Sequence, residues 1–253
     1  TAIPNNCCSF CESLTSVTIP NTVTRIGKLG FGGCTSLASI TLPNALTDIF
    51  DSAFIGCTSL TQIVIPSTVS SIYTYTFANC NKLEKITIDP YKTKIEMNAF
   101  SQCESLKVLT FGNSVESIQK YDFGKFPKLT TIVIPSSVTS IEDNAFEGCS
   151  SLTSITIPNS VKTIGNSSFK GCSSFTQIAL PSTITNIGER CFEGCSSLTQ
   201  MTIPSSVTAI GSYAFSECSS IGQITIPNSI DTIKDHTFYK CSSLNTVSIP
   251  GNV

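Results

Sequence analysis

The chain has 253 residues, of which only 13% are charged, and its formal net charge at pH 7 is −2. This near-neutral balance argues against nucleic acid or an anionic membrane surface as a partner. No apolar run approaches the roughly 18 residues of a membrane-spanning helix, so no direct membrane insertion is expected in this segment. The sequence shows no N-terminal signal segment, and it starts and stops inside a repeat, which predicts a fragment of a longer protein.

A cysteine recurs every 23 residues along the chain. The series is Cys11, Cys34, Cys57, Cys80, Cys103, Cys149, Cys172, Cys195, Cys218 and Cys241, and Phe126 takes the one missing place. Self-similarity this strict is typical of a solenoid, in which each repeat buries its apolar face only against its neighbours. The sequence therefore predicts a single domain over residues 1–253, made of about eleven 23-residue repeats.

The first half of each repeat predicts a strand, as the stretch Phe146–Ile164 illustrates. Phenylalanine stands three residues before the cysteine and leucine three after it, and apolar residues return at Ile155 and Ile157. Their alternation with Ser and Thr predicts a strand with one buried face. A proline follows in most repeats, here Pro158, and it ends the hydrogen bonding of the strand.

The second half of the repeat is too short for a stable helix. Val161 and Ile164 lie twelve and fifteen residues after the cysteine, and a Val-x-x-Ile-Gly segment is both brief and β-branched. We therefore expect a short strand or an extended turn there. The segment from Asn144 to Gly148 is expected to make at most one 3₁₀ or α turn, which points Phe146 inward.

The full pattern, Leu-x-x-Ile-x-Ile-x-x-x-Val-x-x-Ile-x-x-x-x-Phe-x-x-Cys, has the spacing of a leucine-rich repeat. With proline after the strand, Ile-Gly on the far side and Ala-Phe-x-x-Cys at the close, it closely resembles the BspA-type subfamily over essentially the whole chain. The resemblance implies a right-handed, gently curved leucine-rich repeat solenoid with a continuous parallel β-sheet on its concave side.

The same resemblance implies a function. Family members with known roles resemble secreted or surface-anchored adhesins, so we expect an extracellular or cell-surface module that binds a host matrix or cell-surface protein. A structural spacer or stalk within a larger surface protein, with recognition elsewhere, is the main alternative. An intracellular scaffold is a third, which reduced thiols would permit.

The ten cysteines of the series are expected to form a reduced structural ladder. Side chains in the same slot of stacked coils point the same way, which is poor disulfide geometry, whereas a small thiol suits an interior corner. Bridging stays open as an alternative, above all in the first coil, where Cys7 or Cys8 has thiol neighbours. Cys191, which takes a slot usually held by alanine, is likewise undecided.

No catalytic residue, metal site or cofactor is predicted. The one histidine, His236, lies in the most variable part of the repeat, and no nucleophile elbow or phosphate-binding loop occurs. Cys8-Ser-Phe-Cys11 has the spacing of a metal-binding pair, but zinc needs about four ligands and no second pair follows at a suitable distance. We therefore expect a non-enzymatic protein.

The outward strand positions, five and seven residues after each cysteine, predict a flat, hydroxyl-rich face that suits an extended protein ligand. Residues that simply favour strands would look the same. Between residues 82 and 128 the repeat departs from its template, gaining charge and tyrosines and placing Lys92 at an interior valine position. Tyrosine and lysine are what a binding patch adds, although repeat degeneration with Tyr91 turned inward is an open alternative. The predicted protein-binding residues are Gln62, Lys85, Thr87, Tyr91, Lys107 and Thr110.

Two further expectations concern the surface. Asn166-Ser-Ser168 is the only Asn-x-Ser/Thr sequon, so Asn166 is a possible glycosylation site. Ends without polar capping repeats predict end-to-end self-association.

Overall fold

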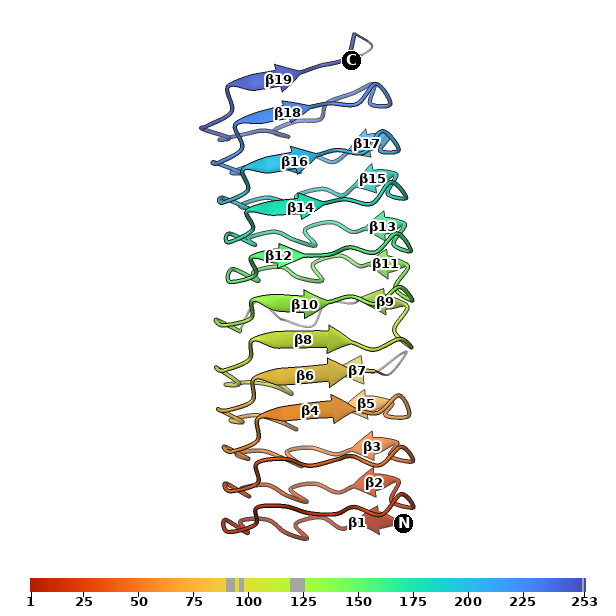
Figure 1. The fold of residues 1–253 in the computed structure, drawn as a ribbon, viewed down its shortest axis with the longest axis vertical. Coiled ribbons are helices and arrows are strands. Elements are labelled where there is room, and N and C mark those ends of the chain that lie inside the picture. Colours follow the sequence, from red (N-terminus) through yellow and green to blue (C-terminus); the bar gives the residue numbers. More distant parts are fainter. Residues whose placement is uncertain (90–93, 96–97, 119–125, 252) are drawn as a thin grey trace. The chain divides into compact units, whose positions relative to one another are not determined.

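The computed structural model describes residues 1–89, 94–95, 98–118, 126–251 and 253. Contacts between Cα atoms divide these residues into two compact units, Thr1–Val115 and Glu116–Val253. Each unit is a stack of coils built from short parallel strands (Figure 1). Both units are therefore parallel β-solenoids, as the 23-residue period predicts.

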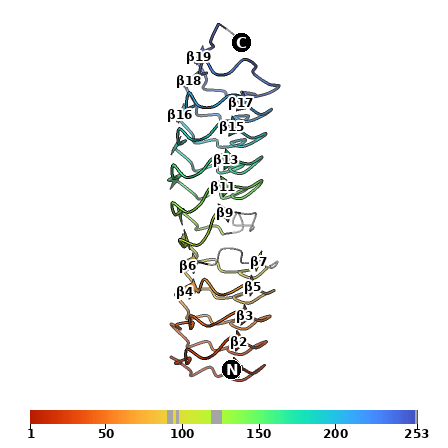
Figure 2. The same ribbon diagram turned by 90° about the vertical axis from the view of Figure 1, so that its right-hand side faces the viewer.

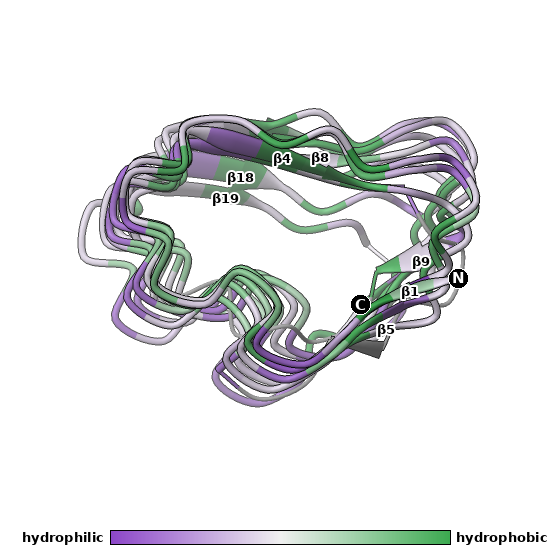
Figure 3. Cartoon of the chain, turned by 90° about the horizontal axis from the view of Figure 1, so that it is seen from below, coloured by the Kyte–Doolittle hydropathy of each residue, from purple (hydrophilic) through white to green (hydrophobic). Residues whose placement is uncertain are grey.

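In the first unit the strands lie on two opposite sides of the coils (Figures 2 and 3). One side carries three four-residue strands paired in the order β4 (Gln62–Ile65), β6 (Lys85–Ile88) and β8 (Val108–Phe111). The other side carries two-residue strands paired in the order β1 (Ala2–Ile3), β2 (Arg25–Ile26), β3 (Asp48–Ile49), β5 (Ser71–Ile72) and β7 (Lys94–Ile95).

The second unit repeats this plan. On one side the paired strands are β10 (Thr131–Val133) with β12 (Ser154–Ile155), β14 (Gln177–Ala179) with β16 (Gln200–Thr202), and β18 (Gln223–Thr225) with β19 (Thr246–Ser248). On the other side the order is β9 (Ser117–Ile118), β11 (Ser140–Ile141), β13 (Thr163–Ile164), β15 (Asn186–Ile187) and β17 (Ala209–Ile210).

The register of these strands places residues 23 apart directly beside one another. Ile63 pairs with Ile86, and Gln177 pairs with Gln200. In β4 and β14, for example, the isoleucine side chains are buried and their neighbours face outward, as the alternating pattern predicts. The short strand expected at the Val-x-x-Ile segment is also present, for example as β13.

Columns of identical side chains fill the interior of each unit. In the first unit the rings of Phe54 and Phe77 lie 5.3 Å apart and almost parallel. In the second unit Phe192 lies 5.5 Å from both Phe169 and Phe215. These rings are shielded from solvent on both faces only because a coil lies above and below them, so stability depends on stacking rather than on any single coil.

The segment from Asn144 to Gly148, where at most one 3₁₀ or α turn is expected, contains no helix, and no helix occurs among the described residues. Asn144 and Gly148 both have left-handed backbone conformations, with φ of 57° and 77°. Successive N–H groups therefore alternate in direction. Phe146 N donates to Ser168 O of the next coil at 2.8 Å, whereas Glu147 N donates back to Asn144 O at 3.2 Å. In a helix, consecutive N–H groups form hydrogen bonds within the same segment. Here every second N–H group instead donates to a carbonyl oxygen of the next coil.

Close approach between coils makes Gly188 hard to replace. A Cβ added there would lie 2.7 Å from the carbonyl carbon and oxygen of Gly165 and 2.8 Å from Asn166 N, all of them backbone atoms. We expect Gly188→Ala to lower the free energy of unfolding by about 1–3 kcal/mol, because the coils must separate to admit the methyl group. Urea denaturation followed by circular dichroism measures this.

Gly222→Ala is the matched control, since nothing lies within 4 Å of a Cβ at Gly222. Its unfolding free energy is expected to stay within about 0.5 kcal/mol of the parent. Equal losses in the two variants would contradict the close packing of coils at Gly188.

Candidate protein-binding surface

Strands β4, β6 and β8 present two rows of outward-facing side chains. Their register fixes the rows as Gln62–Lys85–Val108 and Val64–Thr87–Thr110. Gln62 and Lys85 are exposed, Thr87 and Thr110 are half-buried, and Val64 is 57% exposed. Hydrogen-bonded strands hold both rows in a fixed arrangement.

A shallow hollow opens at the start of these strands. It is lined by Thr61, Gln62, Glu84, Lys85, Lys107 and Val108. Lys107 Nζ forms an ion pair with Glu84 Oε1 at 2.7 Å, and both side chains are about half exposed. Exposed pairs of this kind contribute only about 0–1 kcal/mol, so a ligand can displace this one at little cost. Within the described ranges Lys85 has no ion-pair partner and is the unpaired cation of the hollow.

The structure brings together three of the six predicted binding residues: Gln62, Lys85 and Lys107 all line the hollow. Thr87 and Thr110 lie two positions further along their strands. Tyr91 and Lys92 lie outside the described residues. Glu84 was not among the predicted residues. The sequence nevertheless contained a signal for it, since the register places opposite charges one repeat apart, such as residues 84 and 107, side by side.

The corresponding face of the second unit differs in charge. Its outward strand residues on β10, β12, β14, β16, β18 and β19 are all uncharged, and Gln177, Gln200 and Gln223 form an exposed amide row. A second hollow lies between β16 and β18, which are not paired with each other, and its lining includes Gln200, Thr202, Gln223 and Thr225. Charge on the outward strand positions of the two units is thus confined to the first.

Within each unit the predicted ladder cysteines occupy the same slot of successive coils. Cys34, Cys57, Cys80, Cys103, Cys149, Cys172, Cys195 and Cys218 are buried, Cys241 is half-buried and Cys11 is exposed, and all are free thiols. The Sγ donates to the carbonyl oxygen 26 residues earlier, as from Cys57 to Phe31 at 3.3 Å and from Cys195 to Phe169 at 3.3 Å. The thiol therefore bonds the preceding coil, a role that alanine or valine could not fill.

Burial also sets the chemistry of these thiols. It raises the pKa of Cys57, Cys103 and Cys149 from the ordinary 9.0 to about 12. It raises the pKa of Cys80, Cys172 and Cys195 well above 9.0. Only the thiolate is nucleophilic, so the buried ladder is chemically inert at neutral pH.

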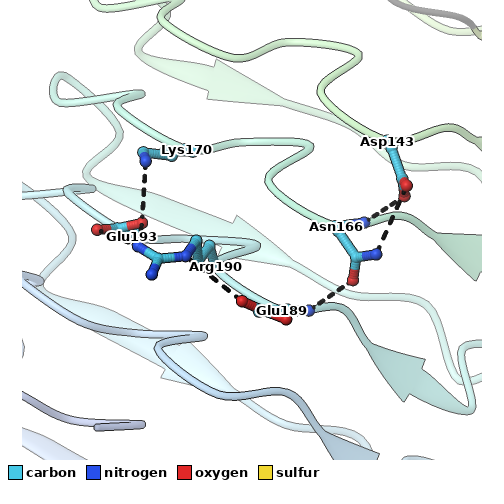
Figure 4. A network of polar contacts seen from close by, with 6 residues as sticks. All are labelled: Asp143, Asn166, Lys170, Glu189, Arg190 and Glu193. Atoms are coloured by element: carbon cyan, nitrogen blue, oxygen red, sulfur yellow. Dashed lines mark hydrogen bonds and ion pairs between the residues drawn. The ribbon is translucent and has the colours of Figure 1, made fainter.

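Asn166, the possible glycosylation site, is exposed and belongs to a ladder of polar side chains (Figure 4). Its backbone N donates to Asp143 Oδ1 at 2.6 Å, and its Oδ1 accepts from Glu189 N at 2.8 Å. Glycosylation, which takes place at Nδ2, stays a prediction.

The neighbouring charged side chains in Figure 4 form ion pairs with one another. Arg190 Nη1 donates to both carboxylate oxygens of Glu193 at 3.1 and 3.0 Å, and the guanidinium lies 4.3 Å above the ring of Tyr213. Lys170 Nζ also contacts Glu193, at 3.2 Å. This lateral network therefore leaves little charge for a ligand.

Neither a metal-binding cluster nor a membrane-spanning helix is found in the described part of the chain. No group of three His, Cys, Asp or Glu side chains is arranged to hold a metal ion there. No helix with the length and apolar character to cross a bilayer occurs among the same residues.

The repeat pattern matches a known family along its whole length. The model of the BspA type leucine rich repeat region matches residues 1–126, 83–174 and 162–253. The chain belongs to the BspA-type leucine-rich repeat family. No curated protein matches this BspA-type chain.

Solved structures of bacterial leucine-rich repeat proteins are similar to this BspA-type chain. A leucine-rich repeat protein from Bacteroides ovatus ATCC 8483 is 28% identical, with 99% of this chain and 76% of that chain covered and a TM-score of 0.68. A leucine rich cell surface protein from Faecalibacterium prausnitzii A2-165 is also 28% identical, with 98% and 78% covered and a TM-score of 0.50. A leucine-rich repeat protein from Eubacterium ventriosum ATCC 27560, 23% identical with 100% and 77% covered and a TM-score of 0.57, shares the fold.

Proposed function

We propose that this chain is a non-enzymatic, protein-binding module of a secreted or cell-surface protein, and that its partner docks on the β4–β6–β8 face. The observation that carries the proposal is the hollow lined by Gln62 and Lys85, the first residues of β4 and β6, and by Lys107, which directly precedes β8. Membership of a leucine-rich repeat family, whose domains typically mediate protein interactions, and similarity to a cell surface protein support it.

The chemistry of the face indicates what the partner presents. Among the described residues Lys85 has no ion-pair partner, and Lys107 pairs there with the exposed Glu84 alone. Val64, on the same strand as Gln62, offers apolar surface beside these polar groups. A protein surface with a carboxylate next to an apolar side chain complements this arrangement, since interfaces combine an apolar centre with a few charged contacts.

The test compares two triple variants for binding to immobilised host matrix proteins and to host cells. Gln62→Ala/Lys85→Ala/Lys107→Ala removes the lining of the hollow. We expect its affinity to fall at least about tenfold, which corresponds to about 1.4 kcal/mol. Surface plasmon resonance measures the loss, and circular dichroism verifies that the variant is folded.

Lys162→Ala/Gln177→Ala/Gln200→Ala is the control, because it removes one exposed lysine and two exposed amides from the second unit. It is expected to bind as the parent does. Equal affinity of both variants would refute the β4–β6–β8 face as the docking surface. If the parent chain itself binds none of these partners, the chain is a structural spacer rather than a binding module.

A further inference from the structure

The first coil carries two cysteines three residues apart, Cys8 and Cys11, a spacing that no other repeat has. Cys8 takes the slot that phenylalanine holds in the described later coils, and Cys11 takes the ladder slot three residues on. Cys7, immediately before, adds a third thiol in the slot usually held by a small residue. This cluster has no part in the proposed binding face.

The backbone between Cys8 and Cys11 forms a tight turn. Cys11 N donates to Cys8 O at 3.2 Å, and Phe10, the third residue of the turn, has a left-handed φ of 58°. A turn of this kind holds the first and fourth Cα atoms within about 7 Å. Disulfides span Cα separations of about 4.4–6.8 Å, so the turn holds the two Cα atoms near the range that a disulfide requires.

Both side chains also point to the same side of the coil. In the next coil the equivalent residues, Phe31 and Cys34, are 1% and 0% exposed, so both slots face the interior. The ladder cysteines of successive coils lack this relation, because each Sγ is directed at a carbonyl oxygen of the preceding coil. In the 253-residue chain Cys11 is exposed and Cys8 is half-buried.

We propose that Cys8 and Cys11 form a redox-active site, in which they join in an intra-turn disulfide while the buried ladder stays reduced. The oxidant is a small-molecule disulfide such as glutathione disulfide. The inference does not depend on the proposed binding function.

The reaction proceeds in two balanced exchange steps. The Cys11 thiolate attacks one sulfur of glutathione disulfide, forming a mixed disulfide and releasing one glutathione thiolate. Cys8 then loses its proton to solvent, and its sulfur displaces the second glutathione from Cys11. The two protein thiols together lose two electrons, and one glutathione disulfide gains them and becomes two glutathione thiols. Burial and the neighbouring thiols raise the pKa of Cys8 to about 11, so Cys8 acts second.

The test incubates the folded 253-residue chain in a glutathione redox buffer, counts free thiols and maps the bond by peptide mass spectrometry. Two of the 13 thiols are expected to disappear, with the bond located between Cys8 and Cys11. Cys8→Phe, which restores the phenylalanine of the repeat, and Cys11→Ala are each expected to abolish the loss. Cys7→Ala is expected to leave it unchanged.

Three results would overturn the proposal: no loss of thiols in the folded parent chain, a bond that includes Cys7, or bridging between ladder cysteines. Because Cys8→Phe restores the side chain that fills this slot elsewhere, its failure to oxidise cannot be attributed to a damaged coil.

Discussion

Raising the pH from 7 to about 10 is expected to unfold the protein. Besides Cys34, whose pKa is also raised, eight buried thiols have a raised pKa in the folded chain, mainly because burial desolvates them. They are Cys57, Cys80, Cys103, Cys149, Cys172, Cys191, Cys195 and Cys218. Each contributes stability that is fully present below the unfolded pKa of 9.0, because both states then hold the proton.

Above pH 9 the unfolded thiols release their protons, while the folded ones, whose pKa is raised by burial (to about 12 at Cys57), keep them. The unfolded state then binds fewer protons, so the free energy of unfolding falls by about 1.4 kcal/mol per thiol for each pH unit. Eight thiols together remove roughly 11 kcal/mol at about pH 10, which is comparable with the whole stability of a typical domain. Circular dichroism in an alkaline titration measures the transition.

The variant Cys57→Ala/Cys80→Ala/Cys103→Ala separates this cause from alkaline effects on other groups. It loses three sulfur hydrogen bonds and is expected to be less stable at pH 7. Its stability is nevertheless expected to fall less steeply above pH 9, by about three-eighths of the parent slope. An unchanged slope would show that the thiols are not responsible.

Truncation of Phe192 is expected to have the largest effect of any single substitution. The side chain is fully buried, and its ring stacks at 5.5 Å on Phe169 below and Phe215 above. Phe192→Ala leaves a cavity that the hydrogen-bonded coils cannot close, and we expect a loss of about 3–5 kcal/mol in the free energy of unfolding. Urea denaturation followed by circular dichroism measures it.

Tyr239→Ala is the control for Phe192→Ala. Tyr239 is an aromatic residue of the same unit but is 47% exposed. Its loss is expected to cost less than about 1 kcal/mol. A comparable cost for both variants would mean that the stacked phenylalanines do not form the core of the unit.

The repeating elements could be predicted from the sequence because each is dictated by side chains that recur at one spacing. Ile63 and Ile86 are strand residues with one buried face, and their 23-residue separation fixes their pairing. The turn at Asn144 to Gly148 could not be predicted in the same way. Its left-handed residues and alternating N–H directions depend on carbonyl groups of the neighbouring coil, which no local pattern reports.

The candidate surface was predicted only in part, for a related reason. Outward positions such as Gln62 and Lys85 follow from strand alternation, and the structure gathers them around one hollow. The strand pattern does not determine which charged side chains form ion pairs with one another, because this depends on how far each side chain extends, as for Lys107 and Glu84. The division into two units at Val115 falls within residues 82–128, where the repeat loses its regular composition, while the single domain over residues 1–253 stays a prediction.

A crystal structure of the chain tests the central claim most directly, namely that residues one repeat apart stack in register and build a column of reduced thiols. The predicted result places Sγ of Cys172, Cys195 and Cys218 at 3.4, 3.3 and 3.1 Å from the carbonyl oxygens of Phe146, Phe169 and Phe192. Disulfides among these cysteines, or thiols that point to different carbonyl positions from coil to coil, would contradict it.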